Sequence, residues 1–277
     1  SGNGPIMIPY GSIRDAWVAS GGSGSWMGWP TASQLCTGYS CAQTFQNAVL
    51  SSTPMWGVHA ISWGFAGYWK STDGMNTLGA ALDDMRYLSG GGGGWIQQFA
   101  GAAVMQSQTG PIVRVQYGTM LDHWVRTGGE RGSLGWPLEN QVCVDGACSQ
   151  RFQNGIVTIS PQGGVRTIIG GFIQSWASTG GLATVGAAVS DLTYTTAKGG
   201  GWKQRYAQGM ITQRVGAAPI FSPTGPILAT WERFGAEATW LGWPTAPQTC
   251  DAGICVQQYQ FGVARSDSAG NVTHSGN

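Results

Sequence analysis

The sequence has 277 residues, which is enough for one large domain or two modest ones. Only 10% of the residues are charged and the formal net charge is +1, so neither a nucleic acid nor an acidic membrane surface is an expected partner. No stretch approaches the roughly 18 apolar residues of a membrane span, and no membrane insertion is expected.

The first predicted element is a short amphipathic helix. Ile13 and Trp17 are four residues apart and would share one helix face, and Gly21-Gly22 would end the helix. An apolar residue four positions before a tryptophan recurs along the whole chain. The tryptophans, called the marker tryptophans below and predicted to be core residues, are Trp17, Trp69, Trp124, Trp176 and Trp231.

A glycine turn follows each predicted helix. Three of the turns contain Gly-Trp-Pro, within "MGWP", "LGWP" and "LGWP", whereas Leu78-Gly79 and Val185-Gly186 stand in two turns without tryptophan. The turns with tryptophan alternate with the others, so the chain contains two subtypes of one unit. The tryptophans of the Gly-Trp-Pro turns, called the turn tryptophans below, are Trp29, Trp136 and Trp243.

A hairpin follows each turn. The six cysteines form three Cys-x4-Cys pairs, and Asp145-Gly146 between one pair is a strong two-residue turn signal, so we predict the disulfides Cys36–Cys41, Cys143–Cys148 and Cys250–Cys255. Metal binding and free thiols are the alternatives. In the other two hairpins, the glycine runs 90–94 and 199–201 predict extended loops, and the hairpin tryptophans Trp95 and Trp202 replace the second cysteine.

A later aromatic residue completes the pattern, and its spacing defines five copies of about 54 residues. Each copy predicts a short helix, a tight turn and three or four strands, and such a unit must bury its faces against its neighbours. The expected fold is mainly β with short helices, a closed ring like a five-bladed β-propeller, favoured over an open solenoid because closure removes exposed sheet edges. Within this single domain the copies are 11–61, 62–115, 116–169, 170–223 and 224–277. Residues 1–10 would supply a strand at 5–8 that pairs with the last copy.

The motifs resemble the LGFP repeat, whose pattern is Leu-Gly-Phe-Pro at the turn and then a Phe-x-x-Gly strand. Phe152-Gln153-Asn154-Gly155 matches that strand, while tryptophan replaces the turn phenylalanine in the first, third and fifth copies. The resemblance covers essentially the whole chain. It implies an exported module of actinobacterial envelope proteins, often appended to mycoloyltransferases, amidases or peptidases and thought to hold them on cell-wall polysaccharide, with a propeller-like fold.

Enzyme chemistry has little support in the sequence. His59, His123 and His274 occupy unrelated positions in their copies, and no G-x-S-x-G nucleophile motif is present. We therefore assign no catalytic residue, metal ligand or cofactor. A glycoside-acting enzyme remains an alternative, because its two carboxylates would be brought together only in space.

Binding is the favoured function. All five copies have a glutamine two residues before the later aromatic: Gln43, Gln97, Gln150, Gln204 and Gln257. A glutamine side chain suits a sugar hydroxyl, although a structural role, in which it satisfies the backbone of a neighbouring blade, is favoured over sugar binding. The turn and hairpin tryptophans could either stack on sugars or pack. The expectation is a secreted, monomeric module of the cell envelope, fused to or trimmed from a catalytic domain. It would bind arabinogalactan-type or peptidoglycan-linked glycan at these residues. A protein-interaction propeller is the alternative.

Overall fold

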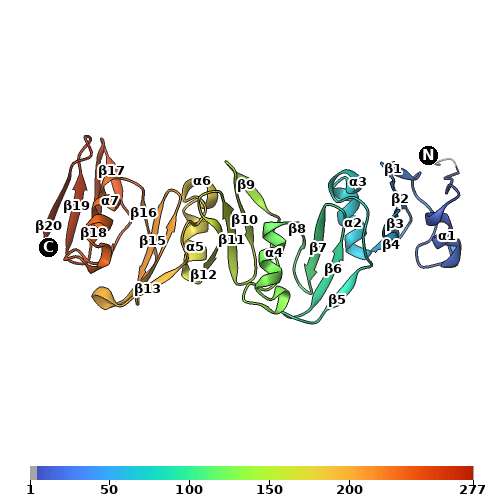
Figure 1. Cartoon of the computed structure of the whole chain (residues 1–277), viewed down its shortest axis with the longest axis horizontal. Helices are drawn as coiled ribbons and strands as arrows, with labels where there is room; N and C mark the ends of the chain where they lie inside the picture. Colours follow the sequence, from blue (N-terminus) through green and yellow to red (C-terminus); the bar gives the residue numbers. More distant parts are fainter. Residues whose placement is uncertain (1–4, 277) are drawn as a thin grey trace. The chain divides into compact units, whose positions relative to one another are not determined.

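The computed structural model describes residues 5–276, and residues 1–4 and 277 lie outside the described part. The chain divides into two compact units, Ser1–Gln141 and Val142–Asn277, each of which is described by itself. The described structure is mainly β, with five four-stranded antiparallel sheets and short helices (Figure 1). The expected fold class is confirmed at this level.

The first unit contains the first two copies and the helix and turn of the third. Each of its sheets is a meander in which consecutive strands pair. The helices are α1 (Ser12–Ala19), η1 (Gly22–Gly24), α2 (Trp63–Ser71), α3 (Gly74–Thr77), α4 (Thr119–Arg126) and η2 (Gly129–Arg131). The strands are β1 (Leu35–Thr37), β2 (Ser40–Thr44), β3 (Ala48–Thr53), β4 (Gly57–Ser62), β5 (Arg86–Leu88), β6 (Gly94–Gln98), β7 (Ala102–Ser107) and β8 (Ile112–Gln116).

The second unit contains the sheet of the third copy and the last two copies. Its helices are α5 (Gly171–Ser178), α6 (Gly181–Thr184), η3 (Ala197–Gly199), α7 (Pro226–Arg233) and η4 (Ala236–Ala238). The sheet of the third copy comprises β9 (Val142–Val144), β10 (Ala147–Arg151), β11 (Gly155–Ser160) and β12 (Gly164–Ile169). The remaining strands are β13 (Thr193–Thr195), β14 (Gly201–Tyr206), β15 (Gly209–Arg214), β16 (Ile220–Pro223), β17 (Thr249–Asp251), β18 (Ile254–Tyr259), β19 (Gly262–Ser266) and β20 (Val272–Gly276).

The marker tryptophans explain why each helix and turn recur together. In every copy the indole Nε1 donates a hydrogen bond to the carbonyl of the turn glycine, as from Trp176 to Gly186 at 2.8 Å. The glycine is required there because its φ is positive, for example +80° at Gly186. The marker tryptophans are buried in four copies and half-buried at Trp17, which confirms their prediction as core residues.

The two subtypes join the paired strands of their hairpins in different ways, by a disulfide or by an aromatic pair. The three predicted disulfides are present, and Cys143 lies directly opposite Cys148 on paired strands. In the second and fourth copies a tyrosine and a tryptophan occupy the same opposed positions, Tyr87 with Trp95 and Tyr194 with Trp202. Their ring centroids are 5.3 and 5.0 Å apart. An aromatic pair thus replaces the disulfide across the hairpin.

The N-terminal segment differs from expectation. Residues 5–9 belong to no helix or strand, so the strand expected at 5–8 is not formed in the described structure. Ile8 instead packs beside the core that contains Ile13 and Phe45. Pairing of this segment with the last copy, and with it the closure of a ring, stays a prediction. Within the described residues, no helix is long and apolar enough to cross a membrane.

Candidate functional site

The five glutamines are buried, so their expected contacts with a sugar are wrong for this structure. Gln97, Gln204 and Gln257 join successive copies, whereas Gln43 bonds to Ala32 O in its own copy. Gln97 Nε2 donates to the carbonyl of Asp83 in its own copy and to that of Ala60 in the copy before, at 3.0 and 2.9 Å. Gln204 makes the equivalent pair of bonds to Ser190 and Thr167. Backbone carbonyls buried at a junction need donors, and an amide side chain supplies them. The five buried glutamines are Gln43, Gln97, Gln150, Gln204 and Gln257.

Two of the three turn tryptophans are also unavailable to a ligand. Trp136 and Trp243 are 0% exposed, which overturns their assignment as sugar-stacking residues. Trp136 enters the glycine hairpin of the copy before it, and its Nε1 donates to the Gly90 carbonyl at 3.1 Å. A Cβ added at Gly94 would lie 2.7 Å from the Trp136 ring, so the hairpin admits the indole because it is built of glycine.

Trp243 repeats the arrangement in the second unit. Its Nε1 donates to Ala197 O at 3.0 Å, and a Cβ on Gly201 would lie 2.8 Å from its ring. Bulk at the turn is therefore compensated by glycine in the preceding copy. At the other junctions between successive copies, a side-chain hydroxyl of the earlier copy accepts a hydrogen bond from the backbone of the following turn. Ala81 N donates to Ser51 Oγ, and Ala188 N donates to Thr158 Oγ1.

Trp29 and the hairpin tryptophans keep accessible surface. Trp29 is 60% exposed. Trp202 is 37% exposed and Trp95 is half-buried, and each ring meets that of its tyrosine partner at a steep angle, 56° and 66° between the ring planes respectively. The structure therefore leaves Trp29, Trp95 and Trp202 as reachable aromatic side chains, on three different copies.

The three histidines have different surroundings. His59 Nδ1 lies 3.1 Å from Asp84 Oδ1 and its Nε2 lies 2.7 Å from Trp56 O, so both ring nitrogens already face oxygen atoms. Burial, with the nearby Arg126 charge as a second cause, lowers the pKa of His123 on α4. In the described part of the chain, no group of three or more His, Cys, Asp and Glu could hold a metal ion.

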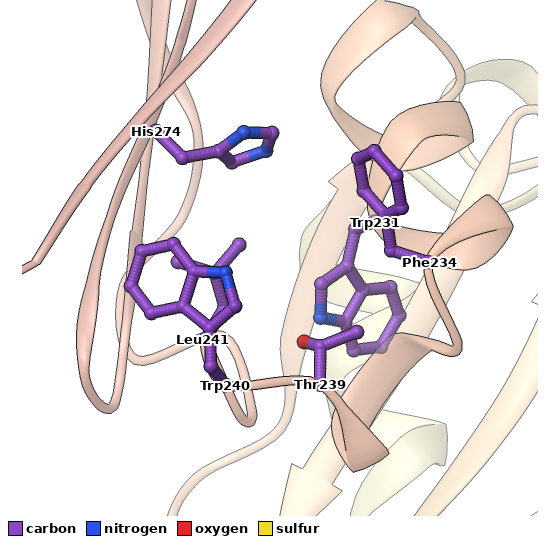
Figure 2. Close-up of a pocket in the computed structure, with 6 residues that line it drawn as sticks. All are labelled: Trp231, Phe234, Thr239, Trp240, Leu241 and His274. Carbon is purple, nitrogen blue, oxygen red and sulfur yellow. The ribbon is translucent and has the colours of Figure 1, made fainter.

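A hollow in the last copy is lined mainly by aromatic side chains. It has a volume of about 400 Å³ and lies between the α7–η4 turn region and β20. Figure 2 shows His274 and Trp240 on one side and Trp231 and Phe234 on the other. The His274 ring centroid is 6.1 Å from that of Phe234 and 6.4 Å from that of Trp240. Leu241 and Thr239 complete the lining.

The chemistry of this hollow suits an amphipathic ligand. Trp240 and Phe234 are exposed and offer flat apolar surface, while Trp231 is buried and fixed by its bond to Gly242 O. His274 Nε2 has no hydrogen-bond partner among the described residues. Aromatic faces beside an unsatisfied ring nitrogen can hold a ring that is apolar on its faces and polar at its edge.

Sequence reasoning missed this hollow although a signal was present. The residue before the Met-Gly or Leu-Gly of the turn is tryptophan in the first and last copies, Trp26 and Trp240, but Ser133 in the third. Since both are more than half exposed, they are not explained by the core. His274 could not have been associated with Trp240 by spacing, because β20 brings it there from 34 positions away.

Comparison with known proteins identifies the repeat. No curated protein matches the sequence. A selenomethionine-substituted virginiamycin B lyase from Staphylococcus aureus is 12% identical, with 89% of this chain and 69% of that chain covered and a TM-score of 0.16. The hemopexin fold protein CP4 from cow pea is 11% identical, with 69% and 88% covered and a TM-score of 0.17. Structural similarity this low carries no argument. The LGFP repeat model matches residues 78–132 and 134–183, and each match begins at or beside the Leu-Gly of a turn. Residues 78–183 of this chain are therefore two LGFP repeats, as the turn motifs indicated.

Proposed function

We propose that this protein is a non-catalytic carbohydrate-binding module that attaches a protein to cell-wall polysaccharide. The observation that carries the proposal is the hollow of the last copy, in which Phe234, Trp240 and His274 surround a space of about 400 Å³. A sugar ring presents apolar C–H groups on its faces and hydroxyls around its edge. It would stack on the exposed rings of Trp240 and Phe234, beside His274.

Weak single sites are sufficient for attachment. A shallow aromatic site of this kind would bind with a Kd of about 1 mM, or about −4 kcal/mol. Several such sites on one polymer would raise retention through effective concentration, without any new contact. The exposed aromatic residues on other copies are available for that purpose, with Trp29 the one turn tryptophan of the three that can take part.

The setting of the module is part of the proposal. Three disulfides are typical of an oxidising compartment and indicate an extracellular protein. We propose further that it is a secreted, cell-wall-associated module and that its five sheets form the blades of a propeller-like ring. The repeated junctions support this, because glutamine and tryptophan contacts recur between successive copies inside each unit.

The test is retention on insoluble arabinogalactan and peptidoglycan, with free oligosaccharide as competitor. We expect the full chain to be retained and Trp240→Ala to weaken retention about tenfold, with unchanged thermal unfolding because Trp240 is exposed. Trp56→Ala is the matched control, since Trp56 is equally exposed and lies outside the hollow. Equal retention of Trp240→Ala and Trp56→Ala would remove the hollow from the proposal. Retention that free sugar does not compete would favour the protein-interaction alternative.

A further inference from the structure

Trp63 breaks the local pattern of the repeat. The position six residues before the marker tryptophan is Gly11, Gly118, Gly170 and Gly225 in the other four copies. In the second copy it is Trp63, with a φ of +50°, in the left-handed region that large side chains avoid. The other non-glycine residues of positive φ in the described chain are Asp, Lys and Ala, so Trp63 is the one aromatic residue among them.

Packing does not explain this substitution. Trp63 is 72% exposed, so it gains little from burial that would offset an unfavourable backbone conformation. Glycine at this position would serve the fold better, as it does in the other copies. A strained and exposed tryptophan that the fold does not need indicates a role in binding.

Trp63 lines a hollow of about 500 Å³ at the junction of the first two copies, inside the first unit. Trp26, Gln46 and Asn47 contribute from the first copy, and Trp63, Gly67 and Lys70 contribute from α2. Trp26 is the equivalent of Trp240 in the last copy and is also about half exposed. Two accessible tryptophans from different copies thus line one hollow.

Gly67 keeps this hollow open. The equivalent position in the other helices carries a larger side chain: Asp15, Asp122, Gln174 or Ala229. A Cβ added at Gly67 would meet no atom within 4 Å, so the space beside it is empty of protein. Glycine inside a helix is unfavourable, and here it coincides with the hollow and with Trp63.

Polar side chains that line this hollow have hydrogen-bonding groups and a charge without a partner among the described residues. Gln46 Oε1 accepts from Trp29 N, and Asn47 Nδ2 donates to Trp26 O, which fixes both amides in place. Gln46 Nε2 and Asn47 Oδ1 make no hydrogen bond with the described residues, and each is at an exposed position. Lys70 forms no ion pair with any described acidic group. A donor, an acceptor and a positive charge therefore surround the two indoles.

We propose that this hollow binds a saccharide that carries an anionic substituent. The sugar ring contacts Trp26 and Trp63, its hydroxyls reach Gln46 and Asn47, and its carboxylate or phosphate lies at Lys70. The inference rests on the proposed carbohydrate-binding function and extends it, because the hollow of the last copy has no lysine or arginine in its lining.

Binding is tested by titrating the full chain with trigalacturonate and with its neutral methyl ester, and with glucose 6-phosphate and glucose. We expect one charged probe to bind at least tenfold more tightly than its neutral partner, and the pair that responds identifies the carboxylate or the phosphate as the source of charge. Lys70→Gln should reduce that preference to about onefold. Trp63→Gly, which restores the residue of the other copies, should weaken binding at least tenfold while the Tm stays the same or rises.

Gly67→Gln gives an independent variant, since it introduces the residue of the fourth copy into the hollow and should also block the probe without lowering the Tm. The proposal is overturned if Trp63→Gly binds as the parent does, if its Tm falls as for a core residue, or if charged and neutral probes bind equally. Trp240→Ala should leave the binding of the charged probe unchanged. If the parent chain binds charged and neutral probes equally but is retained on neutral polysaccharide, this site alone is refuted. If the parent chain binds no sugar at all, the proposed function is refuted.

Discussion

One substitution made at the three turn tryptophans is expected to have very unequal effects. Trp136→Ala removes a fully buried indole, at a cost of about 3–5 kcal/mol. It also removes the hydrogen bond to Gly90 O, which adds about 1 kcal/mol. Trp29→Ala removes an indole that is mostly in solvent, and should change the stability by no more than about 0.5 kcal/mol.

Thermal unfolding of the full chain separates these values. At this chain length about 1 kcal/mol corresponds to a Tm shift of roughly 2–4 °C, so Trp136→Ala should lower the Tm by on the order of 10 °C. Trp243→Ala, whose indole is equally buried, should behave like Trp136→Ala. Trp29→Ala should be nearly indistinguishable from the parent.

A second substitution tests whether the fit of the Trp136 indole against the glycine hairpin causes this difference in stability. Gly94→Ala would place a Cβ 2.7 Å from the Trp136 ring and against the backbone oxygen of Gln106. Adding Trp136→Ala clears the first overlap but not the second, so the double variant should lose less stability than the two single losses together. Equal costs at Trp29 and Trp136, or strict additivity of the Gly94 and Trp136 losses, would refute the idea that glycine hairpins receive the following indole.

Three further outcomes are expected. Reduction of the three disulfides should lower the Tm by only a few degrees, because each closes a short loop; a collapse of the near-ultraviolet circular dichroism would contradict this. Trp176→Phe keeps the apolar ring but leaves Gly186 O without its donor, so urea unfolding should report a loss of about 1–3 kcal/mol, and a loss below about 0.5 kcal/mol would argue against the bond. Hydrogen bonds from Asn271 lower the pKa of Asp267 below its usual 3.8, so Asp267 adds stability above that pH that is lost as the pH falls through the lowered value. Carbon-detected NMR titration should place its pKa below that of an unstructured aspartate, and Asn271→Ala should raise it.

Much of each copy could be predicted from the sequence because its signals are local. The Asp145-Gly146 turn fixes Cys143 opposite Cys148, and the helix face of Ile13 and Trp17 follows from a spacing of four residues. The positive φ of Gly186 and the bond it accepts from Trp176 give a physical reason for the recurrence of both residues.

The site residues were predicted less well, because burial at a junction is not a local property. Trp29, Trp136 and Trp243 share one motif, yet Trp136 and Trp243 are buried against glycine hairpins while Trp29 is 60% exposed. Gln97 looks like a ligand-binding amide until its two carbonyl acceptors in different copies are seen. The exchange of glycine for tryptophan at position 63 was visible in the repeat alignment, but its meaning depends on the exposure and φ of Trp63.

The alternation of hairpins has a consequence for how such proteins change length during evolution. A turn tryptophan needs glycine in the copy before it, and the cystine hairpins carry Ser40, Ala147 or Ile254 at the place of Gly94 and Gly201. Gain or loss of a single internal copy would set two units of one subtype side by side. Two neighbouring copies with a turn tryptophan would leave an indole facing a side chain, and two neighbouring copies with a glycine hairpin would leave one hairpin without the indole that fills it. Duplication of a two-copy segment of about 107 residues creates no such mismatch. Related chains should therefore gain and lose internal copies in pairs, so that the heritable unit is a tandem of two and not the single repeat that its motif defines.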